Sequence, residues 1–113
     1  MGETIVILGL GVMGRNLALN FRDHGFRVCG YDPDPMARSA FLAADAGHVF
    51  SNVTDMVATT TPQRFLMLMM PAGASLDDQL ARLMPLLSAG DIVVDGGNSH
   101  FRSTEKRQIL AAK

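Results

Sequence analysis

The residues with the clearest chemical meaning are six near the N-terminus, GLGVMG at positions 9–14, which form a GxGxxG pattern. The pattern directly follows the apolar run Thr4–Leu8 and opens a stretch with helical periodicity. Gly9 permits a tight turn, Gly11 lets backbone approach a ligand, and Gly14 lets a helix pack closely. The helix N-terminus adds free N–H groups and about half a positive charge. The pattern therefore predicts a cradle for the pyrophosphate of a dinucleotide, with a ligand-free turn as the alternative.

An acidic residue, Asp32, follows the second apolar run at about the spacing where a carboxylate meets the adenosine ribose. It would accept hydrogen bonds from the ribose hydroxyls of NAD. It would repel the 2′-phosphate of NADP by at most roughly 4 kcal/mol at an effective dielectric of 20. The pattern favours NAD, while Arg38 leaves NADP open. An ordinary turn role before Pro33 is the alternative for Asp32, and Asp34 is expected to cap the next helix.

Composition excludes several classes of protein. The chain has 113 residues, 48% of them hydrophobic and 19% charged, which is typical of one globular domain. A net charge of −1 argues against nucleic acid as a partner. No apolar run is long enough to span a membrane, and no signal peptide is recognisable, so a cytoplasmic protein is expected. Cys29 is expected to be a buried apolar filler, and no cluster has metal-ligand spacing.

Strand-like and helix-like segments alternate along the chain. The predicted strands are Thr4–Leu8, Arg27–Tyr31, His48–Phe50, Phe65–Met70 and Ile92–Val94. The predicted helices are Val12–His24, Met36–Ala46, Val53–Ala58, one opened by a Ser75/Asp78 capping box, and a tail from about Arg102. This alternation predicts a single α/β domain with a doubly wound, mainly parallel sheet of the Rossmann type, ordered 3-2-1-4-5. Ligands bind such sheets at the carboxyl ends of the strands.

Three segments together resemble a known family. They are GLGVMGRNLALN (Gly9–Asn20), LMLMMPAG (Leu66–Gly73) and GDIVVDGGNSHFRSTEKR (Gly90–Arg107). The chain is similar to the N-terminal coenzyme-binding domain of 6-phosphogluconate dehydrogenase, in the β-hydroxyacid dehydrogenase group. The likeness extends over essentially all of residues 1–113, and MGRNLALN and DGGNS are its most specific parts.

The resemblance implies a set of coenzyme-binding residues. They are Gly9, Leu10, Gly11, Val12, Met13, Gly14, Asp32, Met70, Pro71, Ala72 and Asn98. Asn98 would also contact the sugar-phosphate substrate. NADP-using members of the family usually have Asn-Arg-Thr where this chain has DPD at 32–34, and Lys where it has Pro71. Both differences resemble NAD-preferring members.

The resemblance also implies an activity for the full-length protein. The family oxidises 6-phosphogluconate at C3 and releases carbon dioxide to give ribulose 5-phosphate, a step of the pentose phosphate pathway. Its catalytic lysine and glutamate lie in later segments, so no catalytic residue is assigned within these 113 residues. The fragment is expected to bind coenzyme weakly without turnover, and the full-length protein to be a homodimer or larger. The alternatives are another β-hydroxyacid dehydrogenase and a non-catalytic dinucleotide-sensing module.

Overall fold

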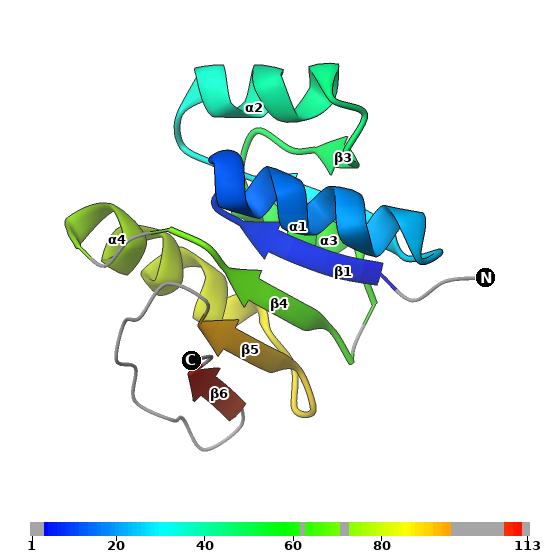
Figure 1. Ribbon diagram of the computed structural model, residues 1–113. Coiled ribbons are helices and arrows are strands. Elements are labelled where there is room, and N and C mark those ends of the chain that lie inside the picture. Colours follow the sequence, from blue (N-terminus) through cyan, green and yellow to red (C-terminus); the bar gives the residue numbers. More distant parts are fainter. Residues whose placement is uncertain (1–3, 62, 71–72, 96–107, 112–113) are drawn as a thin grey trace.

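A computed structural model of the chain describes residues 4–61, 63–70, 73–95 and 108–111. Its strands form one parallel sheet in the order β3-β2-β1-β4-β5-β6 (Figure 1). The strands are β1 (Thr4–Leu8), β2 (Arg27–Tyr31), β3 (His48–Val49), β4 (Phe65–Leu68), β5 (Ile92–Asp95) and β6 (Gln108–Ala111). The helices are α1 (Val12–Asp23), α2 (Pro35–Ala43), α3 (Val53–Thr59) and α4 (Ala74–Leu83), and the 3₁₀ turn η1 (Met84–Leu86) follows α4. The predicted fold class and the order of the first five strands are confirmed.

Two hydrophobic clusters lie on opposite faces of this sheet. Alternate residues of β1 point to opposite faces, so Ile5 and Ile7 enter one cluster while Val6 and Leu8 enter the other. The first cluster includes residues of α1 and α2, and the second includes residues of α3 and α4. Because β1 is buried on both faces, its sequence is a continuous apolar run rather than an alternating one.

Local capping residues set several helix ends, one of them, Asp34, as predicted. The Asp34 carboxylate accepts a hydrogen bond from the Met36 amide at 2.9 Å and caps α2. The Asn52 side chain accepts one from the Asp55 amide at 2.8 Å and caps α3. Gly25 follows the end of α1 with a φ of +91°, the left-handed conformation that glycine adopts most easily. These short-range signals fix where the connections turn toward the next strand.

The predicted capping box of Ser75 and Asp78 is wrong. Helix α4 begins at Ala74 after the N-cap Gly73, and no side chain caps it. Gly73 has a φ of +148°, which lets the chain enter the helix before Ser75 is reached. Asp78 instead forms an exposed ion pair with Arg82 one turn later, at 3.4 Å.

The prediction of a helical tail is also wrong for its described part. Gln108–Ala111 is the strand β6, which pairs in parallel with Ile92–Asp95 of β5. The open edge of β5 offers unpaired backbone donors and acceptors, and pairing with them outweighs the weak helix propensity of four residues.

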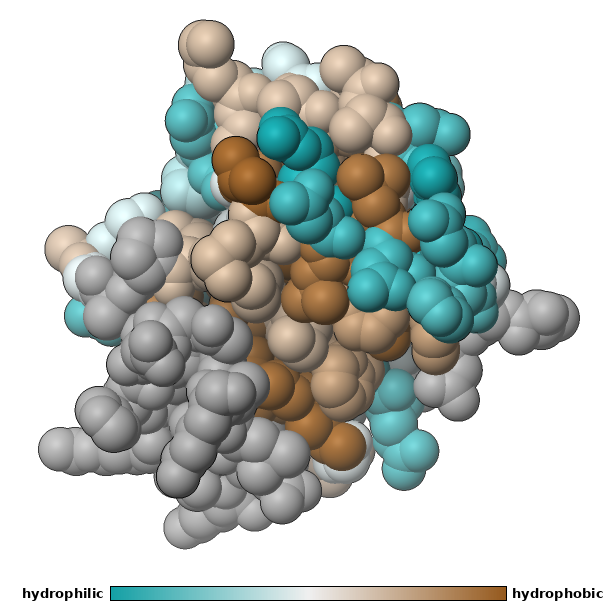
Figure 2. Space-filling view, in the orientation of Figure 1, coloured by the Kyte–Doolittle hydropathy of each residue, from teal (hydrophilic) through white to brown (hydrophobic). Residues whose placement is uncertain are grey.

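One face of β4 and β5 carries hydrophobic surface. Figure 2 shows brown side chains over this part of the sheet, where Figure 1 shows no described helix in front of the strands. Phe65, Met67, Ile92 and Val94 are accordingly only half-buried. Among the described residues, helices therefore cover this face of the sheet at β1 and β2 but not at β4 and β5.

A buried ion pair joins the amino ends of β4 and β5. Arg64 Nη1 lies 2.8 Å from Asp91 Oδ2, and the Asp91 side chain is fully buried. The Asp91 carboxylate also accepts hydrogen bonds from the amides of Arg64 and Ser88, at 2.6 and 2.7 Å. The Arg64 guanidinium donates to the carbonyls of Val57 and Thr60 at the end of α3. The pair therefore ties one helix end to the beginning of two strands.

Asp91→Asn should lower the free energy of unfolding by about 3–5 kcal/mol, since it leaves the Arg64 charge buried without its partner. Asp78→Asn is the matched control, because its pair with Arg82 is exposed, and it should change stability by less than about 0.5 kcal/mol. Chemical unfolding monitored by circular dichroism measures both. Equal losses for the two variants would contradict a special role for the buried pair.

Acid should reveal the same interaction. Burial alone would raise the pKa of Asp91, but hydrogen bonds from Ser88 and Arg64, with the Arg64 charge, outweigh it and lower the pKa. The carboxylate therefore contributes stability above its unfolded-state pKa of about 4, and this is lost as pH falls through the lower folded-state value. The stability difference between wild type and Asp91→Asn should shrink below about pH 4.

Candidate functional site

The carboxyl ends of four strands are aligned at one edge of the sheet. Leu8 of β1 is in register with Tyr31 of β2 and Leu68 of β4, and Leu68 is in register with Asp95 of β5. The GxGxxG segment follows β1 and Asp32 follows β2, so the two lie side by side at this edge, as the sequence predicts. This is the edge at which ligands of doubly wound folds bind.

The first glycine lies in a tightly enclosed backbone turn. Gly9 has a φ of +106°, and its amide donates a hydrogen bond to the Tyr31 carbonyl at 2.8 Å. A Cβ on Gly9 would lie only 2.7 Å from backbone atoms of Met69 and Met70. Positive φ and close backbone contact both require glycine here, and together they hold the turn between β2 and β4.

The other two glycines of the pattern have opposite surroundings. A Cβ on Gly14 would lie 2.1 Å from the Gly9 carbonyl oxygen, so helix α1 packs against the turn only because that atom is missing. A Cβ on Gly11 would meet no atom within 4 Å. Gly14 is thus required by packing, whereas the space above Gly11 is open to a ligand.

The N-terminus of α1 can receive negative charge. Its first amides have no carbonyl partner within the helix, and its first turn contains no acidic side chain. Val12 and Met13 are 62% and 70% exposed, although both are large and hydrophobic. Free amides, the helix dipole and exposed apolar side chains together suit a ligand with both a phosphate and a ring.

Asp32 is bound to this turn through its carboxylate. Oδ2 accepts a hydrogen bond from the Leu10 amide at 2.7 Å, and Oδ1 accepts one from the Asp34 amide at 2.8 Å. Leu10 itself is fully buried. The turn role that the sequence left as an alternative is therefore present. Each carboxylate oxygen keeps further acceptor capacity, so a ribose contact is compatible with these bonds and remains a prediction.

The remaining predicted coenzyme residues divide into two groups. Met70 is buried, and its Cγ would lie 2.8 Å from a Cβ on Gly9, so this side chain supports the turn from the β4 side. Pro71, Ala72 and Asn98 fall outside the described residues.

The sequence indicated for Arg38 only that NADP binding stays open. In the structure Arg38 Nη1 donates a hydrogen bond to the Asp32 carbonyl oxygen at 2.8 Å. Its guanidinium carbon also lies 5.9 Å from the centre of the Tyr31 ring. Arg38 lies six residues after Asp32, and no local sequence pattern indicates these two contacts.

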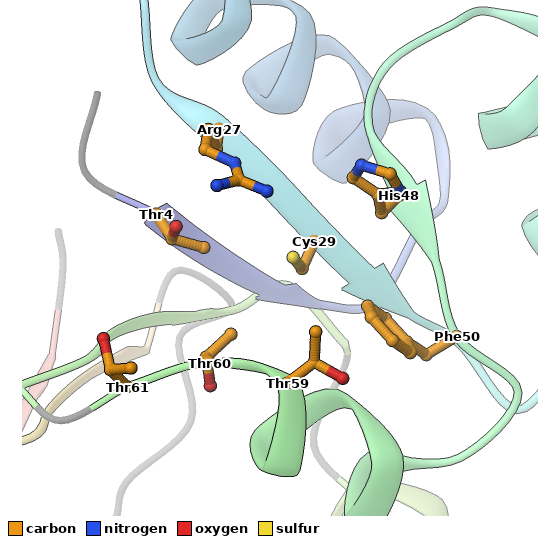
Figure 3. Close-up of a pocket in the computed structure, with 8 residues that line it drawn as sticks. All are labelled: Thr4, Arg27, Cys29, His48, Phe50, Thr59, Thr60 and Thr61. Atoms are coloured by element: carbon orange, nitrogen blue, oxygen red, sulfur yellow. The ribbon is translucent and has the colours of Figure 1, made fainter. Parts of the chain in front are cut away.

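A separate cavity of about 260 Å³ lies at the opposite, amino-terminal edge of the sheet. Figure 3 shows the side chains that line it: Thr4, Arg27, Cys29, His48, Phe50, Thr59, Thr60 and Thr61. None of them belongs to the glycine-rich turn. Burial raises the pKa of the Cys29 thiol, and the nearby Arg27 charge only partly opposes this, so the thiol stays protonated near neutrality. The prediction that Cys29 is a buried filler is confirmed.

Within the described residues, no three His, Cys, Asp or Glu side chains are grouped so that they could hold a metal ion. No helix in the same part of the chain is long and apolar enough to cross a membrane.

The chain matches a family described as the NAD binding domain of 6-phosphogluconate dehydrogenase over residues 4–113. It is 42% identical over 114 residues to rat 6-phosphogluconate dehydrogenase, decarboxylating, covering 96% of this chain and 24% of the rat protein. It is 39% identical over 109 residues to the protein of the same name from Chlamydia trachomatis, covering 93% of this chain and 23% of that one. The chain thus spans about a quarter of the length of these relatives.

The fold is also similar to those of two solved dehydrogenases. Plasmodium falciparum 6-phosphogluconate dehydrogenase, solved in its apo form and in complexes with NADP⁺ and 6-phosphogluconate, superposes with a TM-score of 0.76 at 26% identity. The match covers 87% of this chain and 22% of that one. Mycobacterium tuberculosis 3-hydroxyisobutyrate dehydrogenase superposes with a TM-score of 0.72 at 28% identity, covering 86% and 32%.

The two differently placed glycines give a paired test. Gly11→Ala should change the free energy of unfolding by no more than about 1 kcal/mol, yet weaken NAD binding at least roughly tenfold by filling the open space. Gly14→Ala should destabilise the fold by about 1–3 kcal/mol through overpacking against Gly9. Thermal unfolding measures the change in stability, and isothermal titration calorimetry measures the change in NAD affinity. Normal NAD affinity in Gly11→Ala would show that the ligand lies elsewhere.

Proposed function

This chain belongs to the family of NAD-binding domains of 6-phosphogluconate dehydrogenase, and on that premise we propose that it is the coenzyme-binding domain of an NAD-preferring member. The observation that carries the proposal is the bond between the Asp32 carboxylate and the Leu10 amide. It places a negative charge directly beside the glycine-rich turn. A dinucleotide whose pyrophosphate lies on that turn would bring its adenosine ribose to this charge.

The residues present fit a nicotinamide dinucleotide. The free amides of α1 would hold the pyrophosphate, and Asp32 would accept hydrogen bonds from the ribose hydroxyls. Met70, with Pro71 and Ala72 after it, would line the cofactor beyond β4. Asn98 would touch both the nicotinamide ribose and the substrate. The bound nicotinamide would supply the acceptor for a hydride.

Preference for NAD follows from charge. Asp32 stands where the 2′-phosphate of NADP would come, and two negative groups there repel each other. The residue after Asp32 is Pro33, which has no donor for a phosphate. The Plasmodium relative binds NADP⁺, so the preference proposed here belongs to this chain's own residues rather than to the family as a whole.

For the whole protein we propose the activity that its relatives' name states, oxidation and decarboxylation of 6-phosphogluconate. The product would be ribulose 5-phosphate, within the pentose phosphate pathway, in a cytoplasmic protein that is a homodimer or larger. The 113 residues alone would bind coenzyme without turnover. The fit to 3-hydroxyisobutyrate dehydrogenase favours a sibling β-hydroxyacid dehydrogenase as the second candidate. Formation of NADH by the whole protein with 6-phosphogluconate or with 3-hydroxyisobutyrate distinguishes the two candidates.

A pair of isosteric variants tests the coenzyme preference. Asp32→Asn removes the charge beside the ribose, and it should move the ratio of NADP to NAD affinity toward NADP by about tenfold. Asp34→Asn removes the same charge two residues away and keeps a good helix cap, so it should change the ratio less than about threefold. Arginine is a poorer choice at position 32, because it would leave the Leu10 and Asp34 amides without their acceptor.

Binding is measured by titration, and thermal unfolding provides a second readout. A ligand at 100 times its dissociation constant stabilises the fold by about 2.7 kcal/mol. Wild-type chain should be stabilised more by NAD than by NADP at equal concentration. Stronger stabilisation by NADP, or an unchanged ratio in Asp32→Asn, would contradict the proposed preference.

A further inference from the structure

Arg38 is held at the adenosine end of the candidate site by two contacts. Its Nη1 donates to the carbonyl oxygen of Asp32 at 2.8 Å, and its guanidinium lies over the Tyr31 ring. Both partners belong to the carboxyl end of β2, although Arg38 itself is a residue of α2. The side chain is half-buried, and these two contacts place its guanidinium at the end of β2.

The charge of Arg38 is not neutralised by a carboxylate in the described part of the chain. Arg22, Arg64 and Arg82 each form ion pairs there. The hydrogen bond to Asp32 uses a backbone carbonyl and one of the five N–H donors of the guanidinium. Arg38 thus keeps donors and a full positive charge at the edge where the ribose would lie.

We propose that Arg38 is a specificity-determining residue that receives the 2′-phosphate of NADP and so makes the preference for NAD a partial one. The inference rests on the proposed function and deepens it. Asp32 and Arg38 act in opposite directions on the same group. The carboxylate favours a 2′-hydroxyl and repels a phosphate, while the guanidinium attracts the phosphate and can bind it through two parallel N–H donors.

Position supports this role over a purely structural one. The cation at the start of β2, Arg27, is exposed at the opposite end of the strand and lines the distant cavity (Figure 3). An arginine near the end of the second strand is what accommodates a 2′-phosphate in dinucleotide-binding folds. In this chain the residue directly after Asp32 is a proline. The Arg38 guanidinium reaches the same strand end from α2, six residues further along the chain.

The test compares NAD and NADP binding to the 113-residue chain in three variants. Arg38→Met keeps most of the apolar stem and removes the charge, so NADP affinity should fall by about 10- to 100-fold and NAD affinity by less than about threefold. Arg38→Lys keeps the charge without the fork, so it should recover part of the NADP affinity. Arg27→Met, the same change on the far end of β2, should alter neither coenzyme by more than about twofold.

Salt gives a readout that needs no substitution. Added NaCl should weaken NADP binding more than NAD binding in wild type, and this difference should shrink in Arg38→Met. Parallel losses for both coenzymes in Arg38→Met, or an unchanged ratio, would overturn the role proposed for Arg38 while leaving the coenzyme site intact. Failure of wild type to bind either dinucleotide would overturn the proposed function, and this inference with it.

Discussion

The hydrogen bond from the Leu10 amide to the Asp32 carboxylate is the constraint on which the candidate site depends. It joins the end of β2 to the turn that follows β1, so the two parts of a dinucleotide site are positioned by one contact. Gly9 is fixed from two further directions, by its hydrogen bond to Tyr31 and by the adjoining backbone of Met69 and Met70. Contacts within the chain therefore hold the turn in one shape, and a turn that is already ordered lowers the entropic cost of binding a ligand there.

The two edges of the sheet divide stability and function between them. At the amino edge, Arg64 and Asp91 form a buried pair with several further hydrogen bonds, which joins α3, β4 and β5. At the carboxyl edge, helix amides and the charges of Asp32 and Arg38 remain available to a ligand. A buried pair can stabilise without being reached by solvent, whereas a binding site must keep part of its polar capacity unsatisfied.

Short-range signals in the sequence predicted most of the elements. The apolar run of β1, the caps at Asp34 and Asn52, and the glycine pattern each depend on neighbouring residues alone. The capping box predicted at Ser75 was wrong, because the helix begins at Ala74, directly after Gly73. The strand β6 was missed, because pairing with β5 is a tertiary interaction that overrides local propensity.

The difference between local patterns and tertiary contacts also explains which features of the site were predicted. The glycines and Asp32 belong to a pattern with known spacing, so their neighbourhood followed from the sequence. The double role of the Asp32 carboxylate and the contacts of Arg38 depend on how α2 returns over β2, which no local pattern encodes. Arg64 and Asp91 are likewise brought together from distant positions by the pairing of β4 with β5.

The most direct measurement of where the coenzyme binds is a two-dimensional ¹H–¹⁵N NMR titration of the chain with NAD. The amide resonances of Leu10, Gly11 and Asp34 should shift together with one dissociation constant, because a single ligand would span the turn and the end of β2. The amides of Arg27 and Thr59–Thr61 at the opposite edge should stay unchanged. Shifts confined to that opposite edge, or no shift at the turn, would contradict the placement of the coenzyme at the Asp32–Leu10 contact.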